Sequence, residues 1–303
     1  MYPLLMKIHA GIDKNDLSIE AFCNHVGISR QSFYKAKKVL ELEQKKWSDL
    51  PSLVFNYRKA YDSRAGSRSL FYNLNIKERF GIGVNKFEQV MSELQLNLKP
   101  VRTKVVTTKS STQSWNYFNL ICGLEIHGIN QLVVGDLTYL TIHAQRFYLF
   151  CLTDVYSARI VGWGFGTDMS TAHALCALQM WVHLRGSLEL VNCIHHTDGG
   201  SQYFSILYRT QLSELKVRIS RAEDCLQNGY AEQKNGFVKH HLLPLIKAKT
   251  EIEIRAELGH LLDQYNVDRK QEQLGWMSPV EFENSLKDLS DPPKKILYNF
   301  EQK

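Results

Sequence analysis

Gln131-Leu-Val-Val-Gly-Asp-Leu-Thr-Tyr-Leu-Thr141 is the stretch that decides the fold. It is apolar and rich in branched and aromatic residues, which predicts a β-strand. Two further strand patterns follow at residues 146–154 and 158–165, after short turns at His143-Ala-Gln and Tyr156-Ser-Ala. Strands joined by such short connections pair antiparallel, so the three segments predict a meander.

Helices and strands alternate after this meander. The patterns predict helices at 170–184, 202–215, 227–241 and 250–265, and strands at 190–195 and 216–220. The order β-β-β-α-β-α-β-α is typical of a mixed α/β domain.

A different pattern precedes it, at residues 16–39. Ile19, Phe22 and Val26 recur at helical spacing, Gly27-Ile-Ser29 interrupts the run, and Ser29 can cap a second helix. This predicts a helix-turn-helix whose second helix contacts DNA. The candidate contacts are Arg30, Gln31, Ser32, Tyr34, Lys35, Lys37 and Lys38. The alternative is a helical hairpin with a solvated basic face.

A second helical unit spans residues 66–94. Its first helix starts at Gly66-Ser-Arg-Ser and carries apolar residues through Ile76, and Gly81-Ile-Gly83 forms the turn. Asn85 with Glu88 resembles a capping box that opens the next helix. Arg68 and Lys86 are its candidate DNA contacts, although a purely structural role is equally compatible with the pattern.

Residues 99–114 have the polar, basic composition of a linker. Its cations Arg102, Lys104 and Lys109 are expected to follow a phosphate backbone. Residues 1–110 contain 19 Lys and Arg against 10 Asp and Glu, whereas the remainder contains 18 against 21. This asymmetry favours a nucleic-acid contact in the first part, with solubility as the alternative explanation.

Length and composition narrow the class of protein. A chain of 303 residues predicts two domains with connectors. No apolar run approaches the roughly 18 residues of a membrane helix. The apolar stretch at the N-terminus is too short for a signal peptide. The six cysteines include no Cys-x-x-Cys pair, so we expect buried thiols rather than a zinc site. These features predict an intracellular protein without membrane partners.

Three acids have positions that favour metal chemistry. Asp136 lies inside the first strand, Asp198 follows the fourth strand in His196-Thr-Asp-Gly-Gly-Ser-Gln-Tyr203, and Glu232 lies on the long helix. A carboxylate in an apolar strand is costly unless it is paired or binds a metal. Carboxylates suit Mg²⁺ or Mn²⁺, and two such ions can promote phosphoryl transfer. Each acid taken alone could instead be a turn or surface residue. Asp154 is a rival ligand that we interpret as structural.

Residues 130–283 resemble the retroviral-integrase-like core of bacterial insertion-sequence transposases of the OrfB type. The resemblance rests on Asn130–Tyr139, on Thr153-Asp-Val-Tyr-Ser-Ala-Arg-Ile-Val-Gly-Trp163, on the segment around Asp198, and on Tyr265-Asn-Val-Asp-Arg with Leu274-Gly-Trp-Met-Ser-Pro279. It implies a ribonuclease H-like fold, a mixed five-stranded sheet flanked by helices, preceded by an all-α helix-turn-helix region.

The same resemblance implies roles for individual residues. Asp136, Asp198 and Glu232 would form the catalytic metal triad for Mg²⁺, for which Mn²⁺ substitutes. Lys239 would face the DNA ends, and Lys234 beside it is a further candidate DNA contact. This sequence departs from the family pattern at Val133 and at Gln227-Asn-Gly229. The interval between Asp198 and Glu232 is also slightly shorter than in the family. Glu223 and Asp224 are therefore alternatives to Glu232.

The resulting hypothesis is a DNA transposase that cuts element ends and joins 3′ hydroxyls to target DNA. Alternatives are an inactive, repressor-like DNA-binding protein and a nuclease or resolvase without strand transfer. Expected partners are terminal inverted repeats, target DNA, further copies of the chain and an upstream OrfA product, in the bacterial cytoplasm at the nucleoid. The expected division is a DNA-binding region at 1–98, a basic linker at 99–128, the catalytic core at 129–245 and a helical extension at 246–303.

Overall fold

The computed structural model describes residues 19–99, 117–222 and 225–289, together with 291, 293 and 296–297. The chain divides into two compact units. The first combines residues 1–57 and 66–99, and the second combines residues 58–65 and 100–303. Each unit is described here by itself, and the expected division into four regions stays a prediction.

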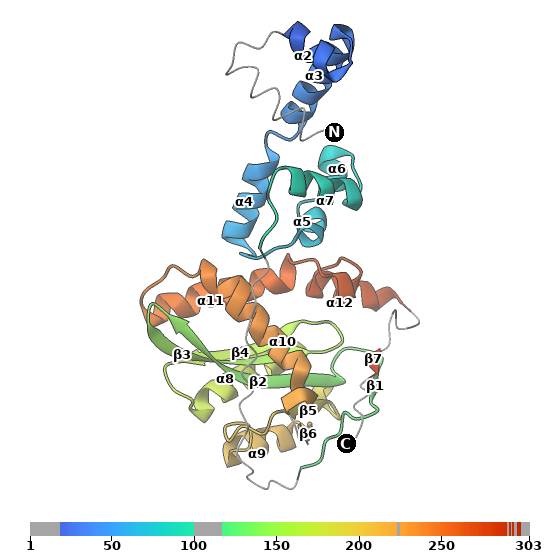
Figure 1. Cartoon of the computed structure of the whole chain (residues 1–303). Helices are drawn as coiled ribbons and strands as arrows, with labels where there is room; N and C mark the ends of the chain where they lie inside the picture. The colour runs from blue at the N-terminus through green and yellow to red at the C-terminus, as the bar shows by residue number, and fades with distance from the viewer. Residues whose placement is uncertain are drawn as a thin grey trace. The chain divides into compact units, whose positions relative to one another are not determined.

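A five-stranded sheet organises the second unit (Figure 1). Its strands lie in the order β4-β3-β2-β5-β6. Strands β2 and β3 and strands β3 and β4 pair antiparallel, and β5 and β6 continue the sheet in parallel with β2. The bounds are β2 Leu132–Ile142, β3 Gln145–Asp154, β4 Ile160–Gly166, β5 Ile194–Thr197 and β6 Arg218–Arg221. The predicted meander and the predicted mixed five-stranded sheet are confirmed.

The hairpin between β2 and β3 shows why the meander could be anticipated. Ile142 pairs with Gln145, so His143 and Ala144 alone form the loop. Both have positive φ values, 47° and 64°. This is the backbone of the two-residue turn that matches the twist of antiparallel strands.

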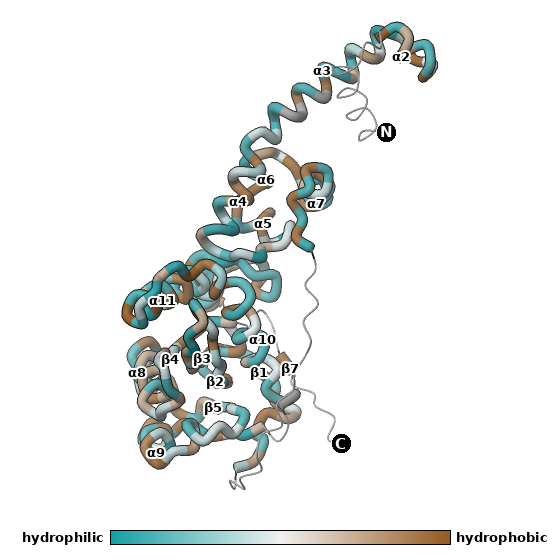
Figure 2. Tube along the Cα trace, turned by 60° about the vertical axis from the view of Figure 1, so that its left-hand side comes forward, coloured by the Kyte–Doolittle hydropathy of each residue, from teal (hydrophilic) through white to brown (hydrophobic). Residues whose placement is uncertain are grey.

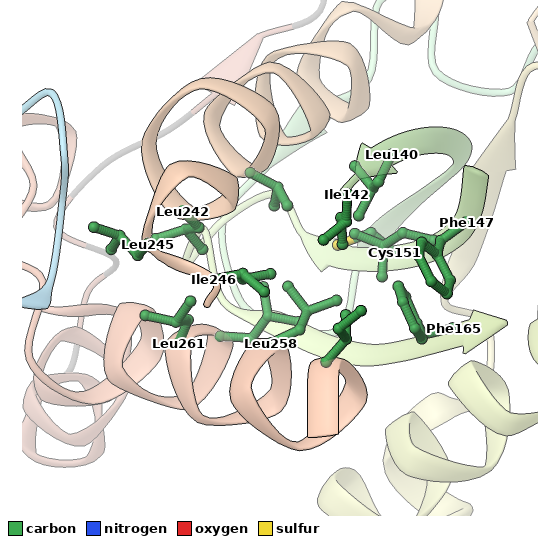
Figure 3. Packing of buried hydrophobic residues seen from close by; sticks show 14 of the residues in the cluster. Leu140, Ile142, Phe147, Cys151, Phe165, Leu242, Leu245, Ile246, Leu258 and Leu261 are labelled. Carbon is green, nitrogen blue, oxygen red and sulfur yellow. The ribbon is translucent and has the colours of Figure 1, made fainter. Parts of the chain in front are cut away.

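Helices cover both faces of the sheet. Helices α8 (Thr171–Arg185) and α9 (Ile206–Glu214) pack on one face, in a cluster that contains Val133, Phe150 and Leu152. The opposite face carries Leu140, Phe147 and Cys151, which pack against α11 (Glu251–Val267) and the turn before it. Figure 3 shows this second cluster. Because side chains alternate along a strand, Asp136 shares the face of Leu140.

The predicted helix 227–241 is divided into three parts. A 3₁₀ turn at Cys225–Asn228 precedes α10 (Gly229–Phe237), and a π turn at Val238–Leu242 follows it. A 3₁₀ turn containing Pro244 then ends the run. Helix α12 (Pro279–Ser285) begins with the capping box of Ser278 and Glu281, and β1 (Glu125–Ile126) pairs with β7 (Ile296–Leu297).

The first unit consists of helices. Their bounds are α2 Ile19–Val26, α3 Arg30–Lys46, α4 Leu50–Ala60, α5 Ser67–Asn73, α6 Ile76–Phe80 and α7 Val84–Glu93. The last residues of α4 belong to the second unit. Ser29 caps α3 as predicted, since its Oγ accepts the N–H of Ser32 at 3.1 Å. Gly27, with φ of 72°, makes the turn, and hydrophilic and hydrophobic residues alternate along α3 (Figure 2).

Two local predictions for the second helical unit were wrong. The helix that starts after Gly66 does not continue through Ile76, because Asn75 takes the left-handed conformation and separates α5 from α6. Asn85 and Glu88 do not form a capping box, since α7 begins at Val84 with Gly83 as its N-cap, two residues before Asn85. Glu88 pairs instead with Arg68, at 3.0 Å.

The longest helices of the described segments, α3 and α11, have 17 residues each. No helix in these segments is long and apolar enough to cross a bilayer.

Asp154 ends β3 and holds the loop to β4. Its carboxylate accepts the backbone N–H groups of Asn130 at 2.8 Å, Tyr156 at 3.0 Å and Ser157 at 3.1 Å. The carboxylate is fully buried, with the guanidinium of Arg185 at 3.8 Å. These contacts support the structural interpretation of Asp154.

We expect Asp154→Ala to lower the free energy of unfolding by about 3–5 kcal/mol. The change leaves three backbone N–H groups without their acceptor and removes one of the two carboxylates that face the buried Arg185, which keeps Glu283. Urea unfolding followed by circular dichroism measures the loss. Asp263→Ala, at an exposed position of α11, is the matched control and should leave the midpoint unchanged. An Asp154→Ala midpoint equal to wild type would contradict this account.

Candidate active site

Asp136 lies inside β2, and Asp198 directly follows the neighbouring strand β5. The parallel pairing of β2 and β5 ends with Gly135 opposite Thr197. The next residue on each strand is therefore one of the two aspartates, and adjacent strands are separated by about 4.8 Å. The strand register brings these two predicted site residues together.

Helix α10 supplies the third side of the site. The amide Nδ2 of Asn228 donates to the carbonyl of Gly135 at 3.2 Å, and that of Asn235 donates to Oδ2 of Asp136 at 2.7 Å. Glu232 lies four residues after the first and three before the second, so all three share one helix face. The carboxylate of Glu232 is exposed.

The electrostatics of Asp136 are dominated by burial. Burial raises the pKa of Asp136 to about 7; repulsion from Asp198 and, more weakly, Glu232 adds to the rise, and the amide of Asn235 opposes it. Burial also raises the pKa of Asp198, against the N–H of Gly200 at 3.1 Å and the charge of Arg221. Two buried carboxylates that repel each other are suited to bind one cation between them, because the cation offsets the repulsion.

We expect Asp136→Asn to stabilise the metal-free protein at pH 8 by about 1–2 kcal/mol. Because the pKa is about 7 in the folded state and about 4 in the unfolded chain, ionisation of Asp136 disfavours folding above pH 4, with the full cost reached above pH 7. Urea unfolding in EDTA at pH 4 and pH 8 measures the effect, which should be small at the lower pH. A gain independent of pH would contradict this assignment.

The loop after Asp198 requires glycine. Gly199 has a φ of 89°, and a Cβ there would lie 2.7 Å from Nε of Arg221. The positive φ therefore strains any other residue at this position, and a Cβ would also require the Arg221 side chain to move. The tight Asp-Gly-Gly turn keeps Asp198 next to Asp136 while Arg221 stays against the loop.

The surroundings of the two aspartates contain buried polar atoms without hydrogen-bond partners in the described segments: Thr197 Oγ1, Asn228 Oδ1 and Asn235 Oδ1. Such atoms are rare in folded proteins unless water or an ion satisfies them. Within these segments, no three acid, histidine or cysteine side chains gather at ligand distance. The donor chemistry nevertheless fits a hard divalent cation, because the oxygens belong to carboxylates and amides.

Most predicted DNA contacts of α3 are exposed, namely Arg30, Gln31, Ser32, Tyr34, Lys35 and Lys38, whereas Lys37 is half-buried. Arg30 also forms an ion pair with Glu20 of α2. In the second helical unit, Lys86 is exposed and Arg68 is engaged with Glu88. The cations Arg102, Lys104 and Lys109 and the acids Glu223 and Asp224 lie outside the described residues.

The two predicted lysines of α10 and its π turn differ. Lys234 is only 5% exposed, its Nζ donates to the hydroxyl of Tyr265, and it stacks on the ring of Tyr230. The prediction that Lys234 contacts DNA is therefore wrong, since Lys234 lies on the face of α10 that packs into the protein. Lys239 is half-buried beside Asp136, which attracts its charge.

Sequence reasoning missed the two asparagines of α10. Asn228 and Asn235 contact β2 directly, but neither carries charge, and an amide on a helix is usually a surface residue. Their spacing from Glu232 was the available signal, because residues four before and three after share its face.

Comparison with known proteins shows which families the chain is similar to. Residues 127–224 match the family model "Integrase core domain". The chain is 34% identical over 160 residues to a protein assigned as the transposase of insertion sequence element IS986/IS6110 in Mycobacterium tuberculosis, covering 51% of this chain and 58% of that protein. It is 27% identical over 269 residues to the insertion element IS600 uncharacterized 31 kDa protein of Shigella sonnei, covering 86% and 96%.

Two further matches complete the comparison. The transposase for insertion sequence element IS629 of Shigella sonnei is 32% identical, covering 52% of each chain. The chain thus spans about half the length of most of these curated relatives. Among solved structures, the catalytic core domain of HTLV-2 integrase in complex with magnesium is 14% identical with a TM-score of 0.41, covering 55% of this chain and 99% of that one.

Proposed function

We propose that this chain, which is similar to insertion-sequence transposases and matches an integrase core, cuts element ends and joins their 3′ hydroxyls to target DNA. The observation that carries the proposal is the pairing of Asp136 with Asp198 across β2 and β5, opposite Glu232 of α10. Mutually repelling carboxylates in a buried setting are a feature of functional sites.

Asp136, Asp198 and Glu232 would hold Mg²⁺, with Mn²⁺ as a substitute. The bound ions supply activation of the attacking oxygen and stabilisation of the leaving oxygen. Glu232 supplies its carboxylate from the solvent side, and the two aspartates supply theirs from the sheet.

Other side chains of the protein orient the carboxylates and supply charge near them. Asn235 fixes the orientation of the Asp136 carboxylate through its hydrogen bond to Oδ2. Asp136 must lose a proton to bind a cation, because its pKa is about 7 in the metal-free protein. Lys239 places a positive charge where a DNA phosphate would approach the carboxylates.

The first unit supports the DNA-binding part of the proposal. The exposed side chains of α3 offer amide, hydroxyl, ammonium and guanidinium donors, which recognise base edges and phosphates. Element ends and target DNA would be the partners, in the cytoplasm at the nucleoid. Several copies of the chain would act together, since two ends must be cut and joined, and an OrfA product would assist them.

Nicking of supercoiled plasmid by the purified chain in Mn²⁺ tests the proposal. We expect nicked circles with Mn²⁺ or Mg²⁺ and none with EDTA. Transfer of a labelled oligonucleotide to the plasmid would separate a transposase from a nuclease. Cleavage that is unaffected by EDTA would contradict the proposed chemistry.

A repressor-like DNA-binding protein is the second candidate. It is favoured by Gln227, whose Oε1 accepts from Asn119 at 2.8 Å, at a position where the transposase pattern has an aspartate. The same plasmid assay separates the two functions, because a repressor would shift the mobility of the DNA without nicking it.

A further inference from the structure

An uncovered edge of β2 begins at the candidate active site. The pairing of β2 with β5 ends at Gly135, so among the described residues the strand pairs only with β3 from Asp136 to Ile142. Tyr139 lies on this stretch, three residues after Asp136, and its side chain is 59% exposed. Because side chains alternate along a strand, Tyr139 lies on the face of β2 opposite to Asp136. Lys239, which contacts the Tyr139 ring and interacts with the charge of Asp136, connects the two across the edge of the strand.

Two cations approach the ring of Tyr139. Nζ of Lys239 lies 4.5 Å from the ring centroid, and Cζ of Arg146 lies 5.6 Å from it. The sheet register explains the arginine: Tyr139 is opposite Tyr148 and Thr141 is opposite Arg146, so Arg146 is a diagonal neighbour on the same face. In the described segments, neither cation forms a salt bridge with a carboxylate.

This arrangement is complementary to a single nucleotide. A base stacks on an aromatic ring with a free energy of about 1–3 kcal/mol, and ammonium and guanidinium groups bind the phosphates on either side. Duplex DNA keeps its bases stacked inside, so the ring can reach only an unpaired or displaced base. Lys239 also interacts with the charge of Asp136, so its ammonium group lies near that carboxylate.

We propose that Tyr139, Lys239 and Arg146 bind an unpaired nucleotide next to the scissile phosphate, with its base stacked on Tyr139. The proposal rests on the proposed function, because it assumes that DNA occupies the site. It adds a positioning role for a residue pair, Tyr139 and Arg146, that lies outside the metal triad.

A duplex with a single-stranded 3′ overhang that carries 2-aminopurine tests the stacking. Binding in EDTA to the full chain should quench the fluorescence of the overhang in wild type and in Tyr139→Phe, which keeps the ring. Tyr139→Leu keeps an apolar side chain without the ring, and should lose most of the quenching. We expect the affinity of Tyr139→Leu for the overhang duplex to fall by about 5–100-fold, and its affinity for a blunt duplex to stay unchanged.

Arg146→Gln separates the phosphate contact from stacking. It should weaken overhang binding and lower its salt dependence while the quenching at saturation remains. Equal quenching in wild type and Tyr139→Leu, or an equal loss of affinity for blunt and overhang duplexes, would overturn the nucleotide site and leave the proposed function standing. Failure of wild type to bind either duplex would remove both.

Discussion

Replacing Asp198 with asparagine is expected to reduce metal-dependent nicking by about a thousandfold or more, and Asp136→Asn should do the same. Each change removes one negative charge from the two aspartates that are proposed to bind the cation beside the β2–β5 pairing. An amide oxygen is a weaker ligand for a hard divalent ion than a carboxylate. Nicked plasmid, quantified on gels at equal protein concentration, measures the loss.

DNA affinity supplies the internal control for these variants. The proposed DNA-binding donors of α3 belong to the first unit and the carboxylates to the second, so fluorescence anisotropy in EDTA should give wild-type affinity. Asp168→Asn is the matched variant, because Asp168 is an exposed carboxylate of the same unit. Substantial nicking by Asp198→Asn would refute the triad, whereas equal inactivity of Asp168→Asn would point to a general defect.

Glu232 is the weakest member of the assignment and can be tested against its neighbours. It shares a helix face with Asn228 and Asn235, and its charge reaches Asp136. We therefore expect Glu232→Gln to be inactive and Glu223→Gln and Asp224→Asn to remain active. Activity of Glu232→Gln with loss in one of the other two would transfer the third ligand to that position.

The order of the sheet was predictable because each strand carries its own local signal. Strands β2, β3 and β4 are continuous apolar segments separated by two short turns, and such segments have few alternatives to an antiparallel meander. Asp136 then falls inside the first strand, and Asp198 falls directly after the fourth. What the pattern could not supply is the register, which places Gly135 opposite Thr197 and makes the two aspartates neighbours.

The errors have a common physical origin. Where a residue is favourable in more than one local structure, packing decides which conformation it adopts. Asn75 adopts the left-handed conformation that ends α5, and Gly83 takes the N-cap position that Asn85 was predicted to hold. Lys234 looks like a surface cation beside Lys239, yet helix geometry turns it toward Tyr265. None of these outcomes is encoded by the residue alone.

Glycine substitutions in β4 are expected to give the largest loss of stability in the second unit. Gly162 and Gly164 alternate along the strand and face α8, whose backbone approaches them directly. A Cβ on Gly164 would lie 1.9 Å from the carbonyl oxygen of His173, and one on Gly162 would lie 2.0 Å from that of Ala177. Because these contacts are with the helix backbone, no side-chain rotation relieves them.

We therefore expect Gly164→Ala to lower the free energy of unfolding by about 3 kcal/mol or more. The helix must move away from the sheet, and Ala174, Ala177 and Trp181 of α8, all fully buried, lose their packing with it. Urea unfolding compares this variant with Gly128→Ala, a control in the same unit where a Cβ meets nothing within 4 Å. Equal midpoints for the two variants would mean that α8 does not rest on the backbone of β4. A selective loss in Gly164→Ala would instead identify this glycine as the reason that helix and sheet can approach so closely behind the paired aspartates.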